Sequence, residues 1–155
     1  MEFQISALNP NQFSHLFGQS DKALADQGVK RIVVDGNPGY PCRVSLRDAE
    51  VGEIVLLFNY EHQPMPTPYR SSHAIFVREH AERSIPEKNE VPQMFRNRLL
   101  SLRAFDSSGV MVDADIIHGD CLESLIERML ANESADYIHI HNARPGCYAA
   151  LARRG

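Results

Sequence analysis

The sequence predicts an α+β fold: a single domain over residues 1–155, with a mostly antiparallel sheet of about six or seven strands and helices packed on one face. Three observations support this. The chain has 155 residues, a length that suits one domain. Its apolar segments are short or alternating and are separated by turn residues, as in strands. Only one segment has the periodicity of a long buried helix.

The expected strands follow from alternation and from short apolar runs. They are residues 3–7, 29–35, 53–60, 72–79, 99–106, 110–117 and 137–142. Ser107-Ser108-Gly109 separates two of them and indicates a hairpin, with glycine available for a positive φ. Residues 144–148 are expected to form a loop.

The expected helices are marked by caps and spacing. Pro10 opens a short helix that ends at Gly18, and Ser20 caps a second that ends at Gly28. Residues 92–98 suit one or two helical turns. Asp120 and Glu123 form a capping pair. The helix after them has apolar residues at the spacing of one buried face: Leu122, Leu125, Ile126, Met129 and Leu130.

Composition and charge exclude several classes of protein. With 16 basic and 20 acidic residues the formal charge is −4, which argues against a nucleic-acid binder that acts through bulk charge. The longest apolar run, residues 54–58, is far short of the roughly 20 residues of a membrane helix, so we expect no membrane partner. No signal peptide is evident, and the three cysteines form no C-x-x-C pair. We therefore expect free thiols and a cytoplasmic location.

A His-x-His pair lies in the last expected strand. His139 and His141 point to one side of residues 137–142, and the two isoleucines point to the other. Alternation predicts a polar face, which is either solvated or a groove for a polar ligand. Its expected members are His139, His141, Arg78, Arg103, Asp113 and Asp115. The two histidines could bind one metal, with a third ligand from His62, Glu61, Asp113 or Cys147, but the spacing selects none of these.

Two loops carry the same chemistry. Pro38-Gly39-Tyr40-Pro41-Cys42-Arg43 and Arg144-Pro145-Gly146-Cys147-Tyr148 each contain a cysteine, a tyrosine, an arginine and a Pro-Gly turn. Cys147 follows His141 by six residues, so it is a candidate nucleophile with His139 or His141 as its base. The alternative is that both loop cysteines are ordinary buried residues.

A polar tract, Asn59-Tyr60-Glu61-His62-Gln63, leaves the expected strand 53–60 and enters a proline-rich loop, a position where sites often form. Together with the two loops and the polar face, it completes the candidate ligand-binding residues. They are Tyr40, Cys42, Arg43, Asn59, Tyr60, Glu61, His62, Arg78, Arg103, Asn142, Arg144 and Tyr148.

Four segments together resemble a known family. They are Gly39-Tyr40-Pro41-Cys42-Arg43-Val44-Ser45-Leu46, Asn59-Tyr60-Glu61-His62, Ile75-Phe76-Val77-Arg78, and His139-Ile140-His141-Asn142-Ala143-Arg144-Pro145-Gly146-Cys147-Tyr148. They resemble the domain of unknown function 1203 family of small bacterial proteins, and the last segment is the most specific. The resemblance implies a single-domain bacterial cytoplasmic protein, and it brings no activity or catalytic residue with it.

Three hypotheses follow. The leading one is a domain that binds a small anionic or polar metabolite and is a candidate enzyme through a Cys/His pair. The alternative is a non-catalytic interaction module, for instance a homodimer. The third is a metal-dependent hydrolase that uses His139 and His141. No cofactor is favoured, and a divalent metal is the only one that the residues suggest.

Overall fold

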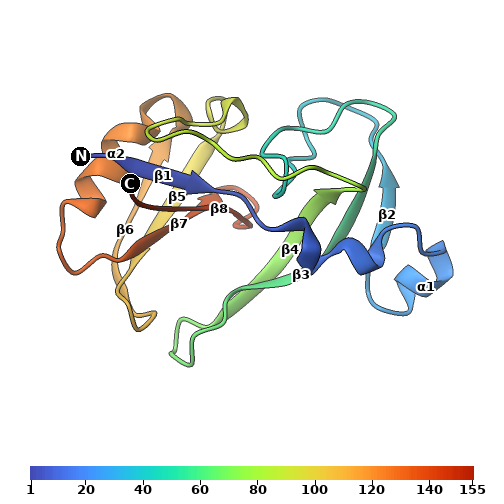
Figure 1. Cartoon of the computed structure of the whole chain (residues 1–155), viewed down its shortest axis with the longest axis horizontal. Helices are drawn as coiled ribbons and strands as arrows, with labels where there is room; N and C mark the ends of the chain where they lie inside the picture. The colour runs from blue at the N-terminus through green and yellow to red at the C-terminus, as the bar shows by residue number, and fades with distance from the viewer.

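The computed structural model describes all 155 residues and contains two antiparallel sheets. The larger sheet has five strands in the order β1-β8-β7-β5-β6, and the smaller has three in the order β2-β3-β4. Figure 1 shows the two sheets side by side, with α2 on the outer side of the larger one. The fold is therefore α+β, as predicted, but it has two sheets where the sequence predicts one.

The strands are β1 (Phe3–Ser6), β2 (Lys30–Val33), β3 (Ile54–Gln63), β4 (Ser71–Arg78), β5 (Leu99–Phe105), β6 (Met111–His118), β7 (Tyr137–Asn142) and β8 (Tyr148–Arg154). The α-helices are α1 (Asp21–Ala25) and α2 (Leu122–Leu130). The 3₁₀ turns are η1 (Pro10–Gln12), η2 (Ser14–Leu16), η3 (Gln93–Phe95) and η4 (Gly119–Cys121).

The predicted count of six or seven strands is wrong because the pattern misses β8. Its sequence, Tyr-Ala-Ala-Leu-Ala-Arg-Arg, consists largely of residues that favour helices. Antiparallel pairing with both β7 and β1 overrides that preference. Ala150 and Ala152 are fully buried in the main core, so β8 lies in the interior of the sheet.

The predicted placement of helices on one face of a single sheet is also wrong. The buried face of α2 is the predicted one, and it packs on the side of the five-stranded sheet that carries Ile138 and Ile140. The other side of this sheet meets the three-stranded sheet, where Tyr148 shares a core with Leu56 and Ile75. The short α1 lies beside β2 at the far end of the molecule (Figure 1).

The polar face is only partly as predicted. Arg103 pairs with His139 in the β5–β7 register, so the two share a face. Both histidines are buried, with His139 3% and His141 0% exposed, so this face is not solvated. Asp113 and Asp115 lie on the α2 side instead, because alternation pairs them with apolar positions of β5.

Those two aspartates bond Arg128 of α2 at 3.2 and 2.9 Å. Arg78 belongs to the smaller sheet, where its Nη2 lies 2.5 Å from a carboxylate oxygen of Glu53.

No helix of the structure has the length and apolar character needed to cross a bilayer.

Candidate functional site

A cavity of about 600 Å³ lies where the loops of residues 38–43 and 144–148, here called the two Pro-Gly-Cys loops, meet. The first loop contributes Gly39, Pro41 and Arg43 to its wall. The second contributes Arg144, Pro145 and Cys147, after Asn142 at the end of β7. The two loops, about a hundred residues apart in the sequence, are adjacent because Arg43 bridges them.

Arg43 is completely buried, and all its partners are on the cavity wall or next to it. Its Nε donates to the Tyr148 carbonyl at 2.7 Å, and Nη1 donates to the Pro41 carbonyl at 2.5 Å. Its Nη2 donates to the Cys147 sulfur at 2.9 Å. Burial lowers the pKa of Arg43, and its contact with Cys147 opposes that shift. No carboxylate is among the hydrogen-bond partners of this guanidinium.

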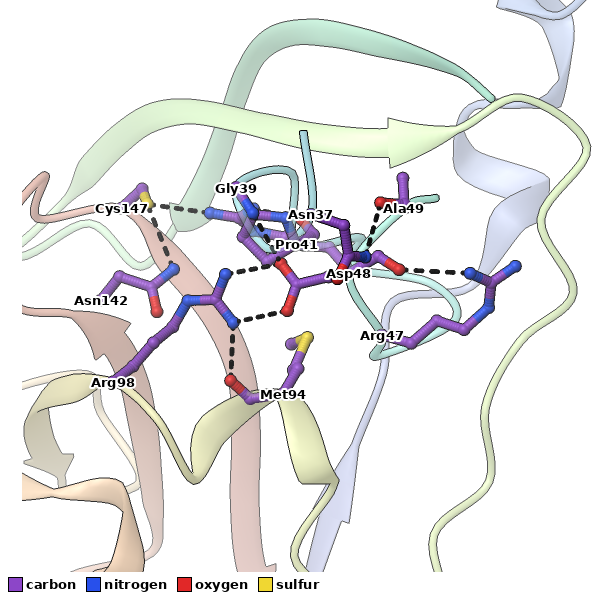
Figure 2. Close-up of polar contacts among 11 residues, drawn as sticks. Asn37, Gly39, Pro41, Arg47, Asp48, Ala49, Met94, Arg98, Asn142 and Cys147 are labelled. Carbon is purple, nitrogen blue, oxygen red and sulfur yellow. Dashed lines mark hydrogen bonds and ion pairs between the residues drawn. The ribbon is translucent and has the colours of Figure 1, made fainter. Parts of the chain in front are cut away.

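Cys147 is 8% exposed and receives a second hydrogen bond, from the Asn142 side-chain nitrogen at 3.5 Å. Figure 2 shows Cys147 and Asn142 close together, with a nitrogen of a guanidinium on the other side of the sulfur. The side-chain amide oxygen of Asn142, Oδ1, is buried and has no hydrogen-bond partner. The cavity wall therefore includes a sulfur that accepts two hydrogen bonds, and the amide that donates one of them keeps a buried, unpaired oxygen.

A second arginine of the wall, Arg98, is neutralised by Asp48 (Figure 2). The pair is bidentate, at 2.9 and 2.6 Å, and Arg98 also donates to the Met94 carbonyl at 2.6 Å. Asp48 accepts a further bond from the Gly39 amide at 3.3 Å, which braces the first loop. Sequence reasoning missed both residues, because a pair separated by 50 positions leaves no local pattern.

Three histidines form a second group, away from the cavity wall. His62 of β3 lies 4.9 Å from His141 and 5.8 Å from His139, measured between ring centroids. Tyr148 stacks on the His62 ring at 5.5 Å and an interplanar angle of 4°. The register of β3 is irregular between Tyr60 and Gln63, so two consecutive residues, His62 and Gln63, are both buried.

These histidines are neutral at pH 7. Burial lowers the pKa of His62 to about 4, and the charge of Arg103 contributes. Burial likewise lowers the pKa of His139 and of His141 to about 3. His141 Nδ1 lies 2.9 Å from the Gly146 carbonyl. Because a carbonyl only accepts, Nδ1 carries the proton and Nε2 has the free lone pair.

The comparison with known proteins identifies the family. The profile described as Protein of unknown function (DUF1203) matches residues 39–154. The chain belongs to this family. The match includes the first loop from Gly39 onward, the whole second loop and all three histidines of the DUF1203 chain, and it confirms the resemblance stated above. Neither the curated proteins nor the solved structures contain a match to it.

The remaining candidates of the DUF1203 chain lie apart from the cavity or serve the fold. Cys42 is buried, and its sulfur accepts bonds from the backbone amides of Ser45 (3.4 Å) and Arg78 (3.3 Å). The Tyr40 hydroxyl donates to Asp35 at 2.8 Å. A separate, shallower surface pocket contains three members of the polar tract: Asn59, Tyr60 and Glu61.

The structure thus divides the predicted site into two groups. Arg43, Asn142, Arg144 and Cys147 line the cavity. His62, His139, His141 and Tyr148 form the other group, with Arg103 on the same face. No hydrogen bond joins Cys147 to either candidate base, since its partners are Arg43 and Asn142.

Proposed function

We propose that the cavity binds a small molecule with an anionic group and presents to it the sulfur of Cys147. The observation that carries this proposal is the 2.9 Å contact between the Cys147 sulfur and a fully buried guanidinium. The proposal differs from the predicted Cys/His pair in that an arginine, and not a histidine, contacts the Cys147 sulfur and favours its nucleophilic form.

The charge of Arg43 supports a thiolate. A buried charge is costly unless a counter-charge lies beside it. Two of the partners of Arg43 are backbone carbonyls, and the third is Cys147, the only one that can become an anion. A nearby arginine stabilises a thiolate, which is the nucleophilic form of cysteine. Arg43 and Cys147 can therefore form a buried ion pair at the wall of the cavity.

The lining of the cavity supports an anionic ligand. It includes no aspartate or glutamate, whereas Arg43, Arg98 and Arg144 all contribute to it. Arg43 and Arg98 both have hydrogen-bond partners within the chain. Arg144 is exposed at the rim and forms no ion pair, so its guanidinium is available to a carboxylate or phosphate.

The proposal can be tested with two alkylating reagents that share a leaving group. Iodoacetate is an anion and iodoacetamide is neutral, and in both cases the sulfur displaces iodide to form a thioether. Exposed Cys121 is the internal reference. We expect the ratio of the iodoacetate rate to the iodoacetamide rate to be about tenfold higher at Cys147 than at Cys121, which corresponds to roughly 1.4 kcal/mol of attraction. Peptide mass spectrometry assigns each site.

Equal ratios at the two cysteines would contradict an anion site, and failure of Cys147 to react in the folded chain would contradict a presented sulfur. The role of Arg43 is tested separately with iodoacetamide alone. Arg43→Gln should slow Cys147 at pH 7 and leave Cys121 unchanged, and Arg43→Lys should retain part of the rate. A purely structural interaction module predicts the same ratio of iodoacetate rate to iodoacetamide rate at every cysteine that reacts.

A further inference from the structure

We infer that His62, His139 and His141 form a binding site for one Zn²⁺ ion with three protein ligands and an open fourth position. This site is separate from the cavity and does not depend on the function proposed for it. The His-x-His pair of β7 supplies two ligands, and the irregular part of β3 supplies the third.

The positions of the nitrogens suit a metal. One ring nitrogen from each histidine lies within 4.8 Å of the other two. Zinc bonds to histidine nitrogen at roughly 2.0–2.1 Å, so tetrahedral ligands stand about 3.4 Å apart. Binding of one ion would therefore require the nitrogens to approach one another by up to about 1.4 Å. His62 is the candidate third ligand that the structure selects, since Glu61 pairs with Arg70 and Asp113 lies on the α2 side.

Each histidine of this cluster has a buried nitrogen with no partner within the chain. Nδ1 of His62, Nδ1 of His139 and Nε2 of His141 are buried, and none has a hydrogen-bond partner. An unsatisfied buried polar atom costs about 1–3 kcal/mol, so three of them in one histidine cluster require an explanation. A bound cation would provide one, because nitrogen lone pairs that lack a donor are what a metal needs.

Contacts from outside the cluster hold two of the three rings, those of His141 and His62. The Gly146 carbonyl accepts the Nδ1 proton of His141 at 2.9 Å, the kind of outer contact that orients a metal-binding histidine and fixes its tautomer. Gly146 has a φ of +79°, a conformation that favours glycine, so the turn after β7 is shaped to bring its carbonyl there. The stacked ring of Tyr148 holds His62.

Charge around the cluster determines what would complete the coordination. The three ligands are uncharged imidazoles, so the ion keeps its double positive charge, and Arg103 faces the cluster from β5. Imidazole ligands suit zinc, and a site with three histidines and one open position is typical of catalytic zinc. The charge of the ion and that of Arg103 together favour an anion, such as hydroxide or a carboxylate, as the fourth ligand.

The test is calorimetric titration of the full chain, freed of metal with EDTA and dialysed, with zinc chloride at pH 7.5. We expect one zinc ion per chain. His139→Gln, His141→Gln and His62→Gln should each weaken binding by more than the roughly 10–100-fold that loss of an outer-shell partner costs. His15→Gln changes an exposed histidine of η2 and should leave the affinity unchanged. Cobalt(II) absorption of the wild type should report tetrahedral coordination.

Two results would overturn the site: no stoichiometric zinc binding by the wild type, or wild-type affinity in His139→Gln. Cys147→Ser should bind zinc normally, and loss of binding in this variant would place the metal on the thiol instead. If a histidine variant fails to fold, thermal shift keeps the test decisive. Zinc should raise the melting temperature of the wild type and of Cys147→Ser, and should not raise that of a folded His62→Gln variant.

Discussion

The cavity and the histidine cluster are both built on the β7–β8 hairpin, yet they meet the same physical problem in opposite ways. At the cavity, the buried charge of Arg43 has every contact supplied by the chain, with two carbonyls and a sulfur around it. At the cluster, three buried imidazoles are uncharged and each keeps a nitrogen with no partner. Each nitrogen of the buried guanidinium therefore has a partner, whereas each buried imidazole has a nitrogen without one.

Strand alternation explains how one hairpin serves both. His141 and Asn142 are consecutive, as are Cys147 and Tyr148, and successive side chains point to opposite faces. One member of each pair joins the cluster, and the other joins the cavity. The difference shows that a buried polar group can be satisfied by its neighbours, as Arg43 is, or left with an unpartnered atom, as each histidine is.

The largest expected effect concerns the satisfied site. Arg43→Met should lower the free energy of unfolding by about 2–5 kcal/mol, because the buried Tyr148 and Pro41 carbonyls each lose a donor, and an unsatisfied buried polar group costs about 1–3 kcal/mol. Urea denaturation measures this. Arg144→Met, at an exposed position with no ion pair, should cost less than about 0.5 kcal/mol. Equal losses in the two variants would show that Arg43 does not join the loops.

Low pH should lower the free energy of unfolding through the histidine cluster. The pKa of His139 is about 3 in the folded chain and about 6.5 when unfolded, so the unfolded chain binds more protons as the pH falls below 6.5. Stability is therefore full above pH 6.5 and is lost toward pH 3. Between pH 7 and pH 5 one such histidine costs about 2 kcal/mol. Urea denaturation in EDTA should show a loss smaller by that amount in His139→Gln, and the same loss in both proteins would contradict it.

Much of each site could be predicted from the sequence, and the reason is local pattern. The two Pro-Gly-Cys loops repeat a composition, and alternation correctly places Arg103, His139 and His141 on one face. The same rule fails for Arg78 because the prediction assumes a single sheet, whereas Arg78 lies in the second. Asp113 and Asp115 are misplaced because their phase relative to β5 depends on the hairpin register.

What the sequence could not provide is long-range pairing. His62 lies at the irregular end of β3, and Arg98 of the cavity wall is paired with Asp48, 50 positions away along the chain. β8 has the composition of a helix and is a strand because β1 and β7 are available on either side of it. In each case the deciding partner lies far away along the chain, where neither periodicity nor propensity carries information.

Asp48→Asn should separate stability from ligand attraction at the cavity. The bidentate bond to Arg98 is mostly buried, so its loss should cost about 1.5–2 kcal/mol in urea denaturation. The same change leaves the charge of Arg98 uncompensated in the cavity wall. The preference of Cys147 for iodoacetate over iodoacetamide should therefore rise by a few fold, since a full charge faces the cavity. A fall in that preference would mean that Arg98 does not act on the ligand space.

The smallest expected change in stability belongs to Arg144→Gln, which should stay within about 0.5 kcal/mol of the wild type because the side chain is exposed and unpaired. Its effect on reactivity is the sharper measurement. If Arg144 attracts the anion at the rim, the ratio of the iodoacetate rate to the iodoacetamide rate at Cys147 should fall about two- to threefold. A change of this size is in the range of an exposed charge contact. Iodoacetamide should react unchanged, because Arg43 still holds the sulfur. A parallel loss with both reagents would instead show that Arg144 shapes the loop, which would leave the cavity without a free cation for its ligand.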